Sequence, residues 1–152
     1  MPQSLARVLV HIVYSTKDRR PWLQTEKIRT DLYKYKATVL RDKVDSPALI
    51  IGGVEDHIHA LCLLSRKFAI MKVIEVSKTA TTKWMKKQGP QYAKFEWQAG
   101  YGIFSVSESN SEKVNEYIAN QAEHHKQASF QNEFRSLCKK HRADIDERYV
   151  WD

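Results

Sequence analysis

The chain of 152 residues has little of what marks extracellular, fibrous or membrane proteins. Its two cysteines, Cys62 and Cys138, lack CxxC spacing and lie in apolar surroundings, which argues against a disulfide framework or a zinc motif and favours a reducing cytoplasm. Five glycines and four prolines form no Gly-rich or Pro-rich stretch, so neither a fibre nor a linker is expected. The apolar runs fall well short of the roughly 18 residues that a membrane helix needs. We therefore expect a folded cytoplasmic protein.

What is present fits one basic domain. The chain is 42% hydrophobic and 11% aromatic, which suffices for one sizeable core but not for two large domains, so residues 1–152 are expected to form a single domain. Lysines and arginines number 25 against 18 aspartates and glutamates, which gives a net charge of +7. This charge attracts polyanions such as nucleic acid, but it does not identify a partner by itself.

Periodicity in the sequence predicts four strands and four helices. Apolar residues alternate, as they do in strands, over residues 8–14, 48–54, 57–64 and 101–107. Helical spacing begins at four positions: Thr25, Ala69, the segment Ser109–Glu112 with a candidate capping box, and Ser129. The resulting order predicts an α+β, ferredoxin-like fold, in which a split β-α-β antiparallel sheet has helices on one face plus additional C-terminal helices.

The clearest local feature is a pair of histidines in one expected strand, His57 and His59. Side chains two residues apart in a strand project from the same face, so both imidazoles would point to one spot, as a metal site requires. Taken alone, such a pair is more often polar surface or hydrogen-bonded core. His11, in the first expected strand, is interpreted as a structural histidine that at most supports the site.

A second feature is the spacing of Tyr117 and Gln121 in one expected helix. Residues four apart share a helical face, so a tyrosine and an amide would lie side by side. Taken alone, a tyrosine at such a position is more often an aromatic anchor of the core. His125 is one turn beyond Gln121 on the same face, whereas His124 is expected off that face, at the surface.

Two groups of basic residues are candidates for phosphate contacts. Residues 66–94 carry eight positive side chains and one negative, and they are interleaved with aromatic residues that could stack on unpaired bases. A solvated helix face explains these lysines equally well. The candidate DNA-binding residues are Lys83, Lys86 and Lys87 in this stretch, and Lys17, Arg19 and Arg20 near the N-terminus.

Several blocks together resemble the IS200/IS605-type single-tyrosine transposases over nearly the whole chain. The blocks are residues 11–17 (HIVYSTK), 52–59 (GGVEDHIH), 97–107 (WQAGYGIFSVS), 117–125 (YIANQAEHH) and 146–152 (DERYVWD). The histidine triplet also occurs in other HUH nucleases, whereas the Tyr-x-x-x-Gln spacing with its flanking blocks is more specific.

The resemblance implies the transposase of an insertion sequence, acting as an endonuclease and strand transferase on single-stranded DNA. Tyr117 would be the nucleophile that forms a 5′-phosphotyrosine, and His57, His59 and Gln121 would hold Mg²⁺ or Mn²⁺. A phenol with a pKa near 10 is a poor nucleophile at neutral pH, so a cation that polarises the phosphate would assist it. Spacing alone leaves His125, Asp56 or Glu55 as alternatives to Gln121.

The resemblance also implies a homodimer that binds DNA hairpins at the element ends. The tyrosine helix would either fold back onto its own subunit or cross to complete the site of the partner, and the sequence does not decide between these arrangements. Two other functions remain open: a domesticated repeat-associated HUH nuclease, and a non-catalytic nucleic-acid-binding module, since RNA-binding domains also use a split β-α-β sheet. A purely structural metal site is a further alternative for the histidines.

Overall fold

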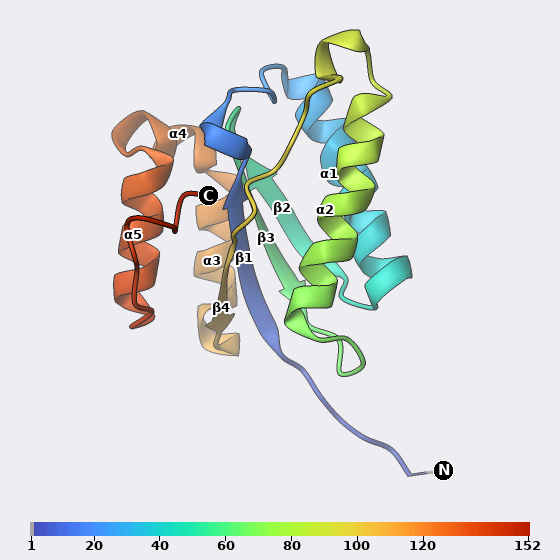
Figure 1. Cartoon of the computed structure of the whole chain (residues 1–152). Helices are drawn as coiled ribbons and strands as arrows, with labels where there is room; N and C mark the ends of the chain where they lie inside the picture. The colour runs from blue at the N-terminus through green and yellow to red at the C-terminus, as the bar shows by residue number, and fades with distance from the viewer. Residues whose placement is uncertain (1) are drawn as a thin grey trace.

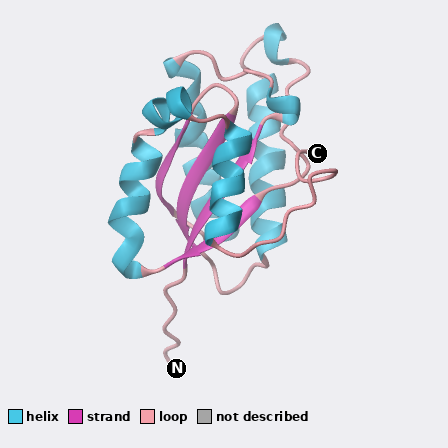
Figure 2. Ribbon diagram, turned by 90° about the vertical axis from the view of Figure 1, so that its left-hand side faces the viewer, coloured by secondary structure: helices cyan, strands magenta, loops and turns pink. Residues whose placement is uncertain are grey.

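The computed structural model describes residues 2–152, which fold around one four-stranded antiparallel sheet (Figures 1 and 2). The strands are β1 (Leu9–Ser15), β2 (Ala48–Gly53), β3 (His57–Leu63) and β4 (Gly102–Val106), and their order in the sheet is β2-β3-β1-β4. The helices are α1 (Glu26–Val44), α2 (Ile70–Lys86), α3 (Ser111–Ala119), α4 (Gln121–Gln127) and α5 (Phe130–Lys140). The predicted ferredoxin-like order is confirmed.

Helices cover both faces of the sheet. In Figure 1, α1 and α2 lie on one side of the strands and the C-terminal helices α3 and α5 on the other. Strand β1 is buried throughout, because its alternate side chains enter both layers. Val10 and Ile12 join the core under α1 and α2, whereas Val13 packs on the α5 side with Phe134. A strand buried on both faces places any polar side chain it carries inside the protein.

The register of the central strands sets the positions of the two histidines. In the antiparallel pairing of β1 with β3, Ser15 lies opposite His57 and Val13 lies opposite His59. Both histidines are therefore one strand in from the β2 edge, and their side chains are 0% exposed.

The expected helix from Ser109 through His125 is not continuous. A 3-10 turn at Glu108–Asn110 precedes α3, and the chain leaves helical geometry at Asn120 (φ −102°, ψ 26°) before α4 begins. The candidate capping box does not form, because the Ser109 hydroxyl lies 3.1 Å from the hydroxyl of Ser107 instead of capping α3. The break at Asn120 changes the direction in which the residues of α4 point.

A close contact between backbones positions α3 on the sheet. A Cβ atom added at Gly52 in β2 would lie 2.5 Å from the carbonyl oxygen of Ile118 in α3, so no larger residue fits without displacing the helix. Because Tyr117 precedes Ile118, this contact also fixes the depth of Tyr117 over the sheet. Among residues 2–152, no helix is both long and apolar enough to cross a membrane.

Candidate active site

The two histidines of β3 are held with their Nε2 atoms toward the C-terminal helices. The Nδ1 atom of His57 lies 2.6 Å from a carboxylate oxygen of Asp56, and the Nδ1 atom of His59 lies 2.7 Å from Nε2 of His11. Each ring is therefore oriented by a neighbour on its Nδ1 side, as is usual for imidazoles that bind metals through Nε2. His11 is 3% exposed and belongs to this site as the orienting partner of His59.

The side chains of Tyr117, in α3, and Gln121, in α4, lie against the two histidines of β3. The ring of half-buried Tyr117 lies 5.7 Å from that of His59 between centroids, nearly perpendicular to it. The Oε1 atom of Gln121 lies 3.0 Å from Nε2 of His57. The helix break comes between the two residues and still leaves their side chains together. All four residues that the sequence proposed for the catalytic and metal roles thus lie around one point, within a single chain.

A fifth residue at this point, Glu133, was missed by the sequence analysis. It lies on α5, is 7% exposed, and accepts hydrogen bonds from the Tyr117 hydroxyl and from Nε2 of Gln121. Its two carboxylate oxygens lie 3.1 Å from Nε2 of His59 and 3.3 Å from Nε2 of His57. A signal was present: Glu133 falls on the apolar face of its helix, beside Phe134 and Phe130. An acidic residue at a core position indicates that its carboxylate is paired inside the protein or binds a ligand.

The carboxylate and the burial of the site shift three pKa values. At His57, contacts with Asp56 and Glu133 outweigh burial and raise the pKa to about 9, whereas at His59 burial dominates and lowers the pKa. Burial, and then the nearby Glu133 carboxylate, raise the pKa of the Tyr117 phenol. The phenol therefore stays protonated at neutral pH and needs added positive charge to act as a nucleophile.

The donor atoms suit a divalent cation. Among residues 2–152, Nε2 of His59 and Oε2 of Glu133 are buried and have no hydrogen-bond partner. Buried polar atoms are almost always paired, so two orphans facing one point indicate a ligand position. Two imidazole nitrogens with amide and carboxylate oxygens form a mixed donor set that suits Mn²⁺, and also Mg²⁺ where water completes the shell.

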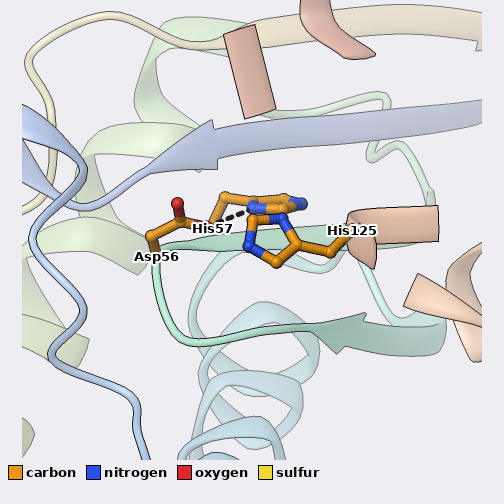
Figure 3. A group of neighbouring side chains, drawn as sticks. All are labelled: Asp56, His57 and His125. Carbon is orange, nitrogen blue, oxygen red and sulfur yellow. Dashed lines mark hydrogen bonds and ion pairs between the residues drawn. The ribbon is translucent and has the colours of Figure 1, made fainter. Parts of the chain in front are cut away.

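The alternatives to Gln121 lie on the far side of His57. Asp56 is already bonded to Nδ1 of His57, and His125 lies beside the His57 ring with 5.6 Å between centroids (Figure 3). Nε2 of His125 is 3.0 Å from Glu55. Asp56 and His125 therefore group with His57 away from Gln121, which faces Nε2 of His57, and Glu55 contacts His125.

His124 contradicts the expectation of an exposed position off the tyrosine face. It is half-buried, and its ring centroid is 4.5 Å from that of Tyr117. The expectation was wrong because seven residues are about two helical turns, so even a continuous helix would place His124 on the face of Tyr117.

An opening leads from the surface to Tyr117. The residues that line a cavity of about 340 Å³ include His11, Tyr117 and two lysines, Lys113 and Lys140. A phosphate group bound there would lie close to two positive charges and to the phenol. Sequence analysis did not select these lysines, because they come from different helices, α3 and α5.

The predicted basic residues lie mainly outside this opening. Lys83, Lys86 and Lys87 are exposed on α2, which packs on the opposite face of the sheet. Lys17, Arg19 and Arg20 lie in and just after a turn that follows β1, where the backbone of Thr16 bonds to Asp56. Lys17 pairs with Glu96, which lines a groove of about 470 Å³ together with Lys83 and Lys86. Of the N-terminal group, Lys17 is therefore linked to this groove, through Glu96.

Comparisons with solved structures identify the class of fold. A protein from Deinococcus radiodurans R1 assigned as a transposase matches with a TM-score of 0.60 and 18% identity, over 80% of this chain and 95% of that chain. A REP-associated tyrosine transposase bound to a REP hairpin matches with a TM-score of 0.56 and 10% identity, over 86% of this chain and 74% of that chain. The chain thus has the fold of these transposases. No curated protein sequence matches it.

The sequence itself identifies the family. A family model described as "Transposase IS200 like" matches residues 4–121, which include both histidines, Tyr117 and Gln121. The chain belongs to the IS200-like transposase family. The match ends before α5, so Glu133 lies outside the part that the family model covers.

Proposed function

We propose that this transposase cuts and rejoins single-stranded DNA through a covalent link to Tyr117. The observation that carries the proposal is that the Tyr117 side chain, in a half-open cavity, contacts the ring of His59, whose Nε2 atom lacks a partner. His57, His59 and Gln121 would hold Mg²⁺ or Mn²⁺. Such an ion, when bound, polarises the scissile phosphate and stabilises the negative charge of the attacking phenol.

The chain's own residues position the reacting groups. Lys113 and Lys140 would hold the phosphodiester in the cavity, and the Tyr117 oxygen would attack the phosphorus atom. The new bond joins the tyrosine oxygen to phosphorus, and the bond from phosphorus to the 3′ oxygen breaks. The phenol proton passes to water and the departing 3′ oxygen takes up a proton. The phosphotyrosine keeps the ester energy, so another 3′-hydroxyl can displace Tyr117 without ATP.

Hairpins in single-stranded DNA are the proposed substrate. The structural neighbour that binds a REP hairpin supports DNA as the partner, and the net charge of +7 gives the attraction to phosphates. The basic groove of Lys83 and Lys86 would contact DNA away from the reacting phosphate. A homodimer remains part of the proposal on the resemblance alone. Because α3 packs on the sheet of its own chain, each protomer would carry a whole site.

Covalent trapping tests the proposal. The full chain is incubated with Mn²⁺ or Mg²⁺ and single-stranded oligonucleotides that span the DNA flanking its own coding sequence, and products are separated on a denaturing gel. We expect a protein–DNA adduct that maps to Tyr117 by mass spectrometry and is absent in Tyr117→Phe. A folded protein that binds this DNA without forming an adduct would support a non-catalytic binding module. An adduct in Tyr117→Phe would show that another residue is the nucleophile.

A further inference from the structure

Glu133 is placed where the proposed ion would be held, yet it belongs to a different part of the chain from the other candidate ligands. His57 and His59 come from β3 and Gln121 from the start of α4, whereas Glu133 comes from the first turn of α5. Phe130 and Phe134, on either side of it, pack in a cluster with Val13 and Phe104. The helix is therefore docked on the sheet in a way that carries the carboxylate inward.

Among the described residues, the buried carboxylate has histidines as its only basic neighbours. Within residues 2–152, its ion-pair contacts are with His57 and His59, and none is with a lysine or arginine. A carboxylate taken out of water is costly unless it is paired with positive charge. Its remaining partners, Tyr117 and Gln121, are neutral donors. A divalent cation, bound in place of the proton on Nε2 of His57, would supply a second unit of positive charge.

The spacing of the donor atoms is that of ligands around one ion. Ligands about 2.1 Å from an ion are about 3.0 Å apart at right angles and about 3.4 Å apart in a tetrahedron. Glu133 lies 3.1 Å from Nε2 of His59 and 3.3 Å from Nε2 of His57, and Gln121 lies 3.0 Å from Nε2 of His57. The pair His59 and Glu133 is this close without forming a hydrogen bond, since Nε2 of His59 has no such partner among the described residues.

We infer that Glu133 is a fourth protein ligand of the ion, so that metal binding fastens α5 to the sheet. This inference rests on the proposed function, because it extends the same metal site. It also reaches beyond the family match, which ends at residue 121. The ion would then join three segments, β3, the start of α4 and α5, and removal of the ion would loosen α5 before the rest of the fold.

Metal titration of the full chain tests this inference. Mn²⁺ binding is measured by calorimetry and by electron paramagnetic resonance for the wild type, for Glu133→Gln, and for Glu123→Gln as a control on an exposed glutamate of α4. Removing an anionic ligand at constant shape should weaken Mn²⁺ binding about tenfold or more in Glu133→Gln, and the control should bind as the wild type does. If Glu133→Gln does not fold, Glu133→Asp takes its place. This variant keeps the charge on a shorter side chain, so its affinity for Mn²⁺ should be lower than that of the wild type, by less than tenfold.

Hydrogen exchange supplies a second readout that does not depend on activity. At a Mn²⁺ concentration of about ten times Kd, the amides of residues 130–140 in the wild type should exchange up to about tenfold more slowly than without metal. In Glu133→Gln, saturated with Mn²⁺, that extra protection should be absent.

The contrary outcomes are distinct. Unchanged Mn²⁺ affinity in Glu133→Gln would overturn the inference, and covalent adduct formation by the same variant would leave the proposed function intact. Tighter binding would overturn it too, because the carboxylate would then compete with the ion for its position. If Glu133→Gln weakens Mn²⁺ binding but the wild type forms no DNA adduct, the ligand assignment stands and the proposed function fails.

Discussion

The two faces of the sheet bury charged side chains in contrasting ways. Under α1 and α2, Lys36 is 2% exposed and donates hydrogen bonds to the hydroxyls of Tyr14 and Ser77. Under α3 and α5, Glu133 is 7% exposed and keeps one oxygen without a hydrogen-bond partner among the described residues. His59, beside it, has an unpartnered ring nitrogen.

This difference separates the Lys36 network from the Glu133 site, and among the described residues the α1 side has one unpaired atom of its own, the buried hydroxyl of Tyr33. A buried polar network whose hydrogen bonds are complete stabilises one arrangement of the fold. A network left incomplete is destabilising by itself and is kept where a ligand completes it. We therefore expect substitutions under α1 and α2 to change the free energy of unfolding but not metal binding. The face under α3 and α5 should be stabilised by bound metal.

The largest effect is expected from removing both imidazoles. The variant His57→Ala/His59→Ala should lose DNA cleavage by about 10³-fold or more, because the ion that stabilises the transition state is no longer held. Binding to hairpin DNA, measured by fluorescence anisotropy, should change little, since it depends on basic and stacking contacts. His141→Ala, a half-buried histidine stacked on Phe104, serves as the control. Loss of folding in the double variant alone would instead indicate a structural metal site.

A substitution under α1 and α2 should lower the stability of the fold without changing its affinity for metal. Lys36→Ala leaves the hydroxyls of Tyr14 and Ser77 without their donor and opens a cavity, so the free energy of unfolding should fall by about 2–4 kcal/mol. Urea denaturation measures the loss. The affinity of the folded variant for Mn²⁺ should equal that of the wild type. A weaker affinity for Mn²⁺ would show that the two faces are not independent.

A smaller effect on metal binding is expected at His11. Its Nε2 atom lies 2.7 Å from Nδ1 of His59, so His11→Ala leaves that ring free to turn. Loss of such an orienting partner typically weakens metal binding about 10- to 100-fold. Calorimetric titration with Mn²⁺ measures this directly. Equal affinity in the wild type and the variant would return His11 to a purely structural role.

The smallest effect concerns the basic residues of α2. Replacing Lys83, Lys86 and Lys87 by glutamine should weaken binding to single-stranded DNA and reduce the slope of log K against log salt by about 2. Filter binding at several salt concentrations gives the slope, with Lys27→Gln, an exposed lysine of α1, as control. If the slope does not change, α2 lies outside the DNA-binding surface.

The sequence predicted the fold well because the fold depends on local periodicity. The strand and helix order follows from apolar spacing, and Thr25 and Ser129 cap their helices as expected, through hydrogen bonds to the amides of Ile28 and Asn132. The shared face of His57 and His59 follows from strand geometry alone. The roles of these residues in metal binding and catalysis remain predictions.

The sequence could not predict features that depend on tertiary contacts. Nothing in the local pattern indicated the break at Asn120. Glu133 and Lys140 reach the site only because α5 folds back onto β1 and β4. Periodicity places a residue on a face of its own helix, but the element that this face meets is set by the whole fold.

Anomalous diffraction from crystals soaked in Mn²⁺ tests most directly the claim that the chemistry belongs to the face under α3 and α5. We expect one strong peak within coordination distance of Nε2 of His57, Nε2 of His59 and Oε1 of Gln121, with a carboxylate oxygen of Glu133 in the same shell. A crystal that shows no peak there, or a peak only at Asp56 and His125 on the Nδ1 side of His57, would contradict it.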